Sequence, residues 1–280
     1  MGNYFRSDIR LAWVHRFAAA ALPLALLFAG CGPADQKPKT EATQTRATAQ
    51  DSAEYHANVA QEASARNDWP QAHEHIDLAI KKTPTYDKYV YMKARYYYLA
   101  GEPLLAYETA KKAESLKGEM DAARHLQALA LLQLNRAPEA IALLETLCNS
   151  PLFVAKTEAC GVLGFQYMTL HEPGKAIIAF NRLVQIDDQD FRGHYYLGQI
   201  ACDAKDWREC ASRCGIAAEL VKKKGFEAVK NYGPLYGYCA AQGEKGLGNA
   251  ARAAEHCTWT CETSHASDSC RKCEQLLAAE

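Results

Sequence analysis

The chain has 280 residues, of which 49% are hydrophobic, and its 32 basic and 33 acidic side chains almost balance. This length and apolar fraction are enough for one large or two ordinary domains with a packed core, and they exclude collagen-like, wholly disordered and polytopic membrane proteins. The net charge of −1 argues against a nucleic-acid binder that depends on a basic surface. Eleven cysteines are too many for casual use in a cytosolic protein, so we expect an exported chain.

The N-terminal segment, 1–30, reads as an export signal. A basic start precedes the apolar run FAAAALPLALLF at 17–28, which is shorter than the roughly 20 residues that cross a bilayer but suits a secretory signal peptide. The run ends in the residues LFAG followed by Cys31, which resembles the lipobox of bacterial lipoproteins. The resemblance implies a signal peptide over 1–30 and acylation of Cys31. The alternative is an ordinary signal peptide followed by an unrelated cysteine.

A polar segment follows the predicted anchor. Residues 32–50 contain no aromatic residue and no Leu, Ile, Val or Met, so they cannot bury enough surface to order themselves. We therefore expect residues 31–51 to be a flexible tether with a reach of roughly 25 Å. Gly32 stands where the inner-membrane retention signal of enterobacterial lipoproteins has Asp. The resemblance thus implies a lipid anchor in the bacterial outer membrane, facing the periplasm.

Small residues recur at a fixed spacing in the rest of the chain. One series is spaced 34, 34, 36 and 34 residues apart, and a second lies twelve positions before it. Two helices approach closely only where neither carries a bulky side chain, so the two series predict a repeated helical hairpin. The first series is Ala72, Ala106, Ala140, Ala176 and Cys210, and the second is Ala60, Ala94, Ala128, Gly164 and Gly198.

The best copy of this pattern resembles the tetratricopeptide repeat (TPR). It reads Leu163-Gly164-x2-Tyr167 and then Ala176-x3-Phe180, although the first-helix Trp of the family is missing throughout. The resemblance implies an all-α fold, a TPR superhelical solenoid of helix-turn-helix repeats, in which Gly164 and Ala176 face each other. Five TPR-like repeats are expected over 52–223. An irregular sixth helix pair and a cysteine-rich helical cap, ending near Leu277, are expected over 224–280.

The ten cysteines other than Cys31 are an even number, as expected for disulfides in an oxidising compartment. Two other uses compete with disulfides at the C-terminal end: a zinc site that includes His256 and His265, and a redox site at Cys270-x2-Cys273, which no βαβ pattern surrounds. Repeat geometry suggests the pairs Cys148–Cys160, Cys202–Cys210, Cys214–Cys239, Cys257–Cys273 and Cys261–Cys270.

The chain has no pattern typical of an active site. His73-Glu74-His75 lacks the HExxH spacing that places two metal ligands on one helical face, and no GxSxG, P-loop or GxGxxG motif is present. We therefore expect no enzyme, no catalytic residue and no cofactor.

In TPR proteins the first helices of the repeats line the concave face. Here that face is expected to carry large apolar and aromatic side chains within reach of solvent, and such a patch usually marks a partner surface. Because it is poor in cations, it favours an apolar or amphipathic helix or an extended segment. The residues are Tyr91, Arg95, Tyr98, His125, Leu129, Leu132, Phe165, Met168, Arg192, Tyr195 and Gln199.

Together these features predict a lipid-anchored, periplasm-facing TPR scaffold that binds protein partners for assembly of an envelope complex. In architecture it resembles type IV pilus pilotins and accessory lipoproteins of the outer-membrane β-barrel machinery. A pilus secretin and the outer-membrane machinery are examples of such a complex, and the resemblance does not identify the client. Two alternatives remain: an adaptor for peptidoglycan enzymes, and a redox or metal-binding protein that uses the C-terminal cysteines.

Overall fold

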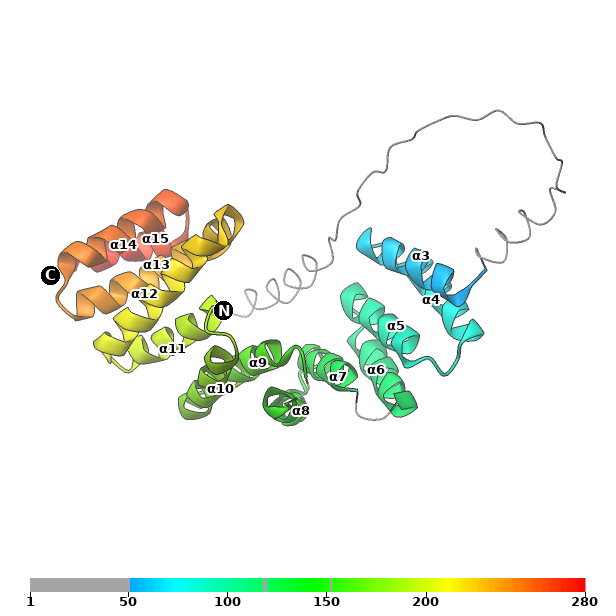
Figure 1. Ribbon diagram of the computed structural model, residues 1–280. Helices are drawn as coiled ribbons and strands as arrows, with labels where there is room; N and C mark the ends of the chain where they lie inside the picture. Colours follow the sequence, from blue (N-terminus) through cyan, green and yellow to red (C-terminus); the bar gives the residue numbers. More distant parts are fainter. Residues whose placement is uncertain (1–50, 118–119, 152, 280) are drawn as a thin grey trace, which may run out of the picture. The chain divides into compact units, whose positions relative to one another are not determined.

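The computed structural model describes residues 51–117, 120–151 and 153–279. The predicted signal peptide, Cys31 and nearly all of the tether lie outside these residues. The described residues form thirteen α-helices and no strand (Figure 1). The helices are α3 (Ala53–Ala65), α4 (Trp69–Lys82), α5 (Asp87–Ala100), α6 (Pro103–Lys117), α7 (Asp121–Gln133), α8 (Ala137–Asn149), α9 (Lys156–Thr169), α10 (Pro173–Ile186), α11 (Phe191–Asp203), α12 (Trp207–Lys224), α13 (Phe226–Gly246), α14 (Ala250–Thr263) and α15 (Asp268–Ala278).

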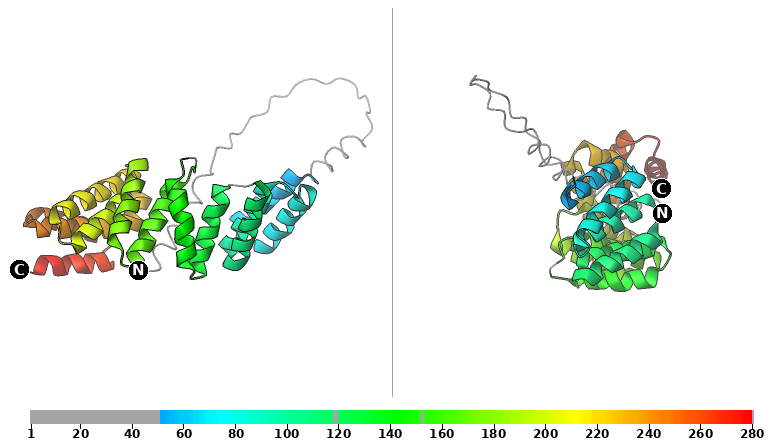
Figure 2. Two further views of the ribbon diagram at one scale, coloured as in Figure 1. Left: turned by 90° about the horizontal axis from the view of Figure 1, so that it is seen from below. Right: turned by 90° about the vertical axis from the view of Figure 1, so that its right-hand side faces the viewer.

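Each helix packs on the next one along the chain, which is the arrangement of a helical solenoid. The pairs α3–α4, α5–α6, α7–α8, α9–α10 and α11–α12 are the five expected hairpins, and α13–α14 is a sixth. Figure 2 shows α15, in red, alongside the α13–α14 pair that it contacts. Ser267 begins α15 by accepting a hydrogen bond from the backbone N–H of Cys270 at 3.1 Å. Among the described residues, no helix combines the length and apolar character needed to span a bilayer.

The turn inside each of the first five hairpins contains one residue with a left-handed backbone conformation, at the same position of the repeat. Its φ lies between 58° and 83°, and the positions repeat at the spacing of the alanine series. In each turn the next backbone N–H donates to the carbonyl five residues earlier, as from Asp68 to Ala63 or from Asp206 to Ala201 (2.9 Å each), which ends the first helix in a Schellman-type motif. The left-handed residues are Asn67, Gly101, Asn135, His171 and Lys205.

The two series of small residues lie in the helix interfaces, where every member is buried. The atoms nearest to an added Cβ on Gly164 belong to Phe180, and the expected contact with Ala176 stays a prediction. A Cβ atom on Gly164 would meet the ring of Phe180 at 2.6 Å, one turn beyond Ala176. In the next hairpin a Cβ on Gly198 would meet Sγ of Cys214 at 2.5 Å. In these two hairpins the side chain four residues after the small residue of the second helix, Phe180 or Cys214, therefore fills the space that the glycine leaves.

Five disulfides link the helices from α8 onward. They are Cys148–Cys160 between α8 and α9, Cys202–Cys210 between α11 and α12, Cys214–Cys239 between α12 and α13, and Cys257–Cys273 and Cys261–Cys270 between α14 and α15. These are the pairs that repeat geometry suggests. Each links a helix to its successor, so the bonds reinforce the same contacts that build the solenoid.

Candidate partner-binding surface

The structure divides the residues expected on the concave face into two groups. Three of them are buried, namely His125 (3% exposed), Leu129 (5%) and Tyr195 (4%), so the expectation that solvent reaches them was wrong. The others keep part of their surface exposed: Tyr91, Arg95, Tyr98, Leu132, Phe165, Met168, Arg192 and Gln199.

Neighbouring helices account for the burial. Helix α7 contacts α5, α6 and α8, and all its residues from His125 to Leu131 are buried. The ring of His125 also lies 5.5 Å from that of Phe153, in the segment between α8 and α9. Tyr195 in α11 packs against Tyr236 of the long helix α13, with ring centroids 4.5 Å apart. The 34-residue pattern does not foresee this contact, because α13 departs from it.

Burial also sets the chemistry of His125. It lowers the pKa of this imidazole to about 4, and Nε2 has no hydrogen-bond partner among the described residues. The side chain is therefore neutral at physiological pH and cannot serve there as a cation on a partner surface.

An aromatic group continues outward from the buried Tyr195. The ring of Tyr196 lies 5.1 Å from that of Tyr195, stacks on Phe180 at 4.9 Å, and meets Phe165 edge-on at 6.1 Å. Tyr196 and Phe165 are half-buried. A partner side chain placed on them would cover aromatic surface that is already fixed by the rings beneath, which is typical of binding hot spots.

Arg192 is held by two carboxylates rather than left free for a partner. Its guanidinium donates to Asp190 at 2.7 Å and to Glu158 of α9 at 3.2 Å. Burial lowers the pKa of Arg192, but these two carboxylates outweigh it and hold the pKa above its ordinary value. The cluster ties α11 to α9 and, with two carboxylates for one cation, adds no positive charge to the face.

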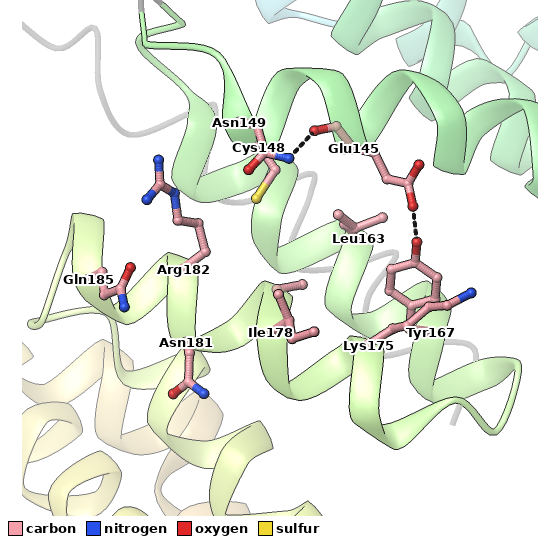
Figure 3. Close-up of a pocket in the computed structure, with 11 residues that line it drawn as sticks. Glu145, Cys148, Asn149, Leu163, Tyr167, Lys175, Ile178, Asn181, Arg182 and Gln185 are labelled. Atoms are coloured by element: carbon pink, nitrogen blue, oxygen red, sulfur yellow. Dashed lines mark hydrogen bonds between the residues drawn. The ribbon is translucent and has the colours of Figure 1, made fainter.

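A second feature lies on the side of the second helices, where α8, α9 and α10 enclose an open hollow of about 710 Å³ (Figure 3). Tyr167 donates a hydrogen bond to Glu145 across it, and burial followed by this carboxylate raises the pKa of Tyr167 to about 12. Ile178 stands in the hollow with 71% of its surface exposed. The lining is completed by Cys148, Asn149, Leu163, Lys175, Ala179, Asn181, Arg182 and Gln185.

The hollow was missed by the sequence reasoning, which considered only the first helices. Its one visible signal is the apolar pair Ile177-Ile178 on the outer side of α10. A smaller hollow of about 410 Å³ lies at the ends of α9 and α11 and includes the predicted residue Met168. The array thus offers surfaces for protein segments on both kinds of helix.

The four C-terminal cysteines, for which a zinc site was the alternative to disulfides, are paired in this structure. Cys257, Cys261, Cys270 and Cys273 form two disulfides. Zinc is bound by thiolates, and a sulfur in a disulfide is not one. The sulfurs of Cys202, Cys214 and Cys239 also lie within 4.8 Å of one another, but each belongs to a disulfide.

Comparison with known proteins finds one matching family model and several solved structures with a similar fold. Residues 65–147, from the end of α3 into α8, match the family model described as anaphase-promoting complex, cyclosome, subunit 3. No protein with a curated description matches the sequence. Three solved structures are similar in fold, although the sequence identity of each to this chain is low.

The first is pilF of Pseudomonas aeruginosa, with 13% identity and a TM-score of 0.66; the match covers 80% of this chain and 96% of pilF. The second is PilW, described as a widely conserved type IV pilus biogenesis factor, with 18% identity, a TM-score of 0.62, and coverage of 79% and 97%. The third is YrrB, described as a TPR protein with an unusual peptide-binding site, with 15% identity, a TM-score of 0.55, and coverage of 71% and 97%.

Proposed function

We propose that this chain, which has the fold of a TPR protein, is a lipid-anchored scaffold that faces the periplasm and binds protein partners during assembly of an envelope complex. The repeat fold makes it a scaffold for protein–protein interaction. The anchor, the compartment and the partner are the proposed parts.

The observation that carries the proposed location is the pairing of all ten cysteines of residues 51–279 into five disulfides. Disulfides persist in oxidising compartments such as the bacterial periplasm and are rare in the cytosol. The export signal and the lipobox-like residues before Cys31 support the same location. Two signals in different parts of the chain therefore agree.

The partner is proposed to lie on the first-helix side, around Tyr98, Leu132 and Phe165, all half-buried. These side chains suit an apolar or amphipathic helix, or an extended segment with apolar side chains. The likeness to pilF and PilW supports a pilus complex as the setting, and it covers 96% of pilF and 97% of PilW.

Affinity purification from detergent-solubilised envelopes tests the partner. The tagged full chain is compared with the double variant Tyr98→Ala/Phe165→Ala and with Leu104→Ala, a control on α6 that is already 53% exposed. We expect wild type and control to recover a secretin or β-barrel component. We expect the double variant to lose it while remaining folded, with only a modest loss of thermal stability because both rings are half-buried. Recovery of a murein hydrolase would instead favour the adaptor function.

The anchor has its own test. In Cys31→Ser the acyl chains cannot be attached, so we expect a soluble periplasmic or unprocessed protein in cell fractionation. Recovery of this variant in the outer membrane at the wild-type level would refute the anchor and leave the partner surface untouched.

A further inference from the structure

Helices α12 and α13, which belong to successive hairpins and pack on each other, are longer than the helices before them. Helices α3 to α11 have 13 to 15 residues, whereas α12 has 18 and α13 has 21. Gly225, with φ of +95°, joins the two without a longer loop (Figure 1). The additional turn therefore ends in a narrow tip, residues 222–230.

The tip combines positive charge with an exposed aromatic ring. Lys222, Lys223 and Lys224 form the longest lysine run in the sequence, and Lys230 follows on the next helix. Residues 219–230 carry four lysines and two glutamates, a net charge of +2, in a chain whose net charge is −1. Phe226, beside the run, is 77% exposed, the largest value for an aromatic side chain among the described residues.

Only one of the four lysines forms an ion pair among the described residues. Lys222 is held by Glu219 at 2.7 Å and lies over the ring of Trp259 at 4.7 Å. Lys223, Lys224 and Lys230 are exposed and form no ion pair within the residues that the structure describes. The dipole of α12 accounts for cations in its last turn. It does not account for a phenylalanine left in water next to them.

We propose that this tip docks on an anionic bilayer surface, with Phe226 at the level of the acyl-chain boundary and the lysines among the lipid phosphates. A short tip with one exposed aromatic side chain offers little surface to a folded partner, but it can enter a fluid interface. Lysines near an anionic membrane and a buried aromatic ring both contribute to such binding. This proposal rests on the proposed anchor, which keeps the chain at a membrane and turns weak docking into an intramolecular step.

Amide hydrogen exchange on vesicles tests the docking. The acylated full chain is reconstituted either in pure phosphatidylcholine vesicles or in vesicles in which phosphatidylglycerol replaces about a third of the phosphatidylcholine. We expect residues 222–230 to exchange at least about tenfold more slowly on the anionic vesicles, and 0.5 M NaCl to abolish the difference, because salt screens exposed charges. Equal exchange on both vesicle types would overturn the proposal.

Two variants and one control sharpen the result. Each lysine near the surface contributes about fivefold to binding, so Lys223→Glu/Lys224→Glu is expected to remove the protection, and Phe226→Ala to reduce it. The control Lys111→Glu/Lys112→Glu changes an exposed lysine pair on α6 and is expected to leave the protection intact. Protection that persists in Lys223→Glu/Lys224→Glu would also overturn the proposal. A chain that fails to sediment with neutral vesicles would instead refute the anchor.

Discussion

Helices α3–α7 and helices α8–α15 differ in how they are held together, because only the second region contains disulfides among the described residues. Helices α3 to α7 contain no cysteine, and fully buried alanines such as Ala60, Ala72 and Ala94 lie in their core. From α8 to α15, five disulfides cross the helix contacts. One repeat geometry is therefore maintained by small-residue packing in both regions and is reinforced by covalent bonds only from α8 onward. Because the stability of a repeat array is close to a sum of local terms, the two regions should respond differently to the same perturbation.

Removing the disulfide between α12 and α13 should have the largest effect. Cys214→Ala/Cys239→Ala opens a link between residues 25 apart in sequence and should lower the free energy of unfolding of α11–α15 by about 2–5 kcal/mol. Amide exchange in α3–α7 should hardly change, because each helix contacts mainly its neighbours. An equal loss of protection in both regions would show that the array unfolds as one cooperative unit.

Acid should destabilise the region without disulfides through His125. Burial lowers the pKa of His125 from 6.5 to about 4, so between these values the unfolded chain binds a proton that the folded chain does not. Stability is therefore lost as the pH falls, by about 3 kcal/mol between pH 7.5 and pH 4. The measurement is the difference in unfolding free energy between wild type and His125→Leu at each pH, in which other groups cancel. A difference that stays constant with pH would contradict the burial of a neutral imidazole.

Overpacking a glycine interface should have the next largest effect. Gly164→Leu places atoms where the ring of Phe180 lies 2.6 Å from an ideal Cβ and should cost about 1–3 kcal/mol in thermal or denaturant unfolding. Gly174→Ala is the control, because nothing lies within 4 Å of its Cβ. It should be neutral or stabilising, since alanine favours the helix by up to about 1 kcal/mol. Equal stability of Gly164→Leu and wild type would show that the repeat register is wrong.

The hairpin turns should give the smallest effects, in opposite directions. Gly101 has φ of +83°, so Gly101→Val should destabilise by about 1–2 kcal/mol, whereas Asn135→Gly, at φ of +60°, should be neutral or slightly stabilising. Chemical denaturation of both variants checks the pair. Similar destabilisation by both substitutions would mean that the side chains, and not the backbone conformation, stabilise these turns.

Much of this fold follows from spacing alone. The alanine series predicted the hairpin register because a small residue is required wherever two helices touch, and facing positions then suggested which cysteines lie close together. The left-handed series has a clear sequence signal at Gly101 and a weaker one at Asn67 and Asn135, since glycine and then asparagine adopt this conformation most readily. His171 and Lys205 have no such signature in a single sequence.

The candidate site was harder to predict because exposure depends on the neighbours of a helix. Position 195 is on the expected face, yet the ring of Tyr195 is covered by Tyr236 from a helix that breaks the repeat. Likewise His125 and Leu129 are enclosed because α7 contacts helices on several sides. Spacing within a repeat says which residues share a face, but not what lies on that face.

The most direct test of the account is an intact-mass measurement. The protein is expressed from the full sequence, isolated from the cell envelope and alkylated without reduction. The account predicts removal of residues 1–30, acylation of Cys31, and no alkylation at the other ten cysteines. Reduction before alkylation should then add ten alkyl groups. A chain that retains its N-terminal signal segment and takes up alkyl groups without reduction would contradict both the envelope location and the covalent support of α8–α15.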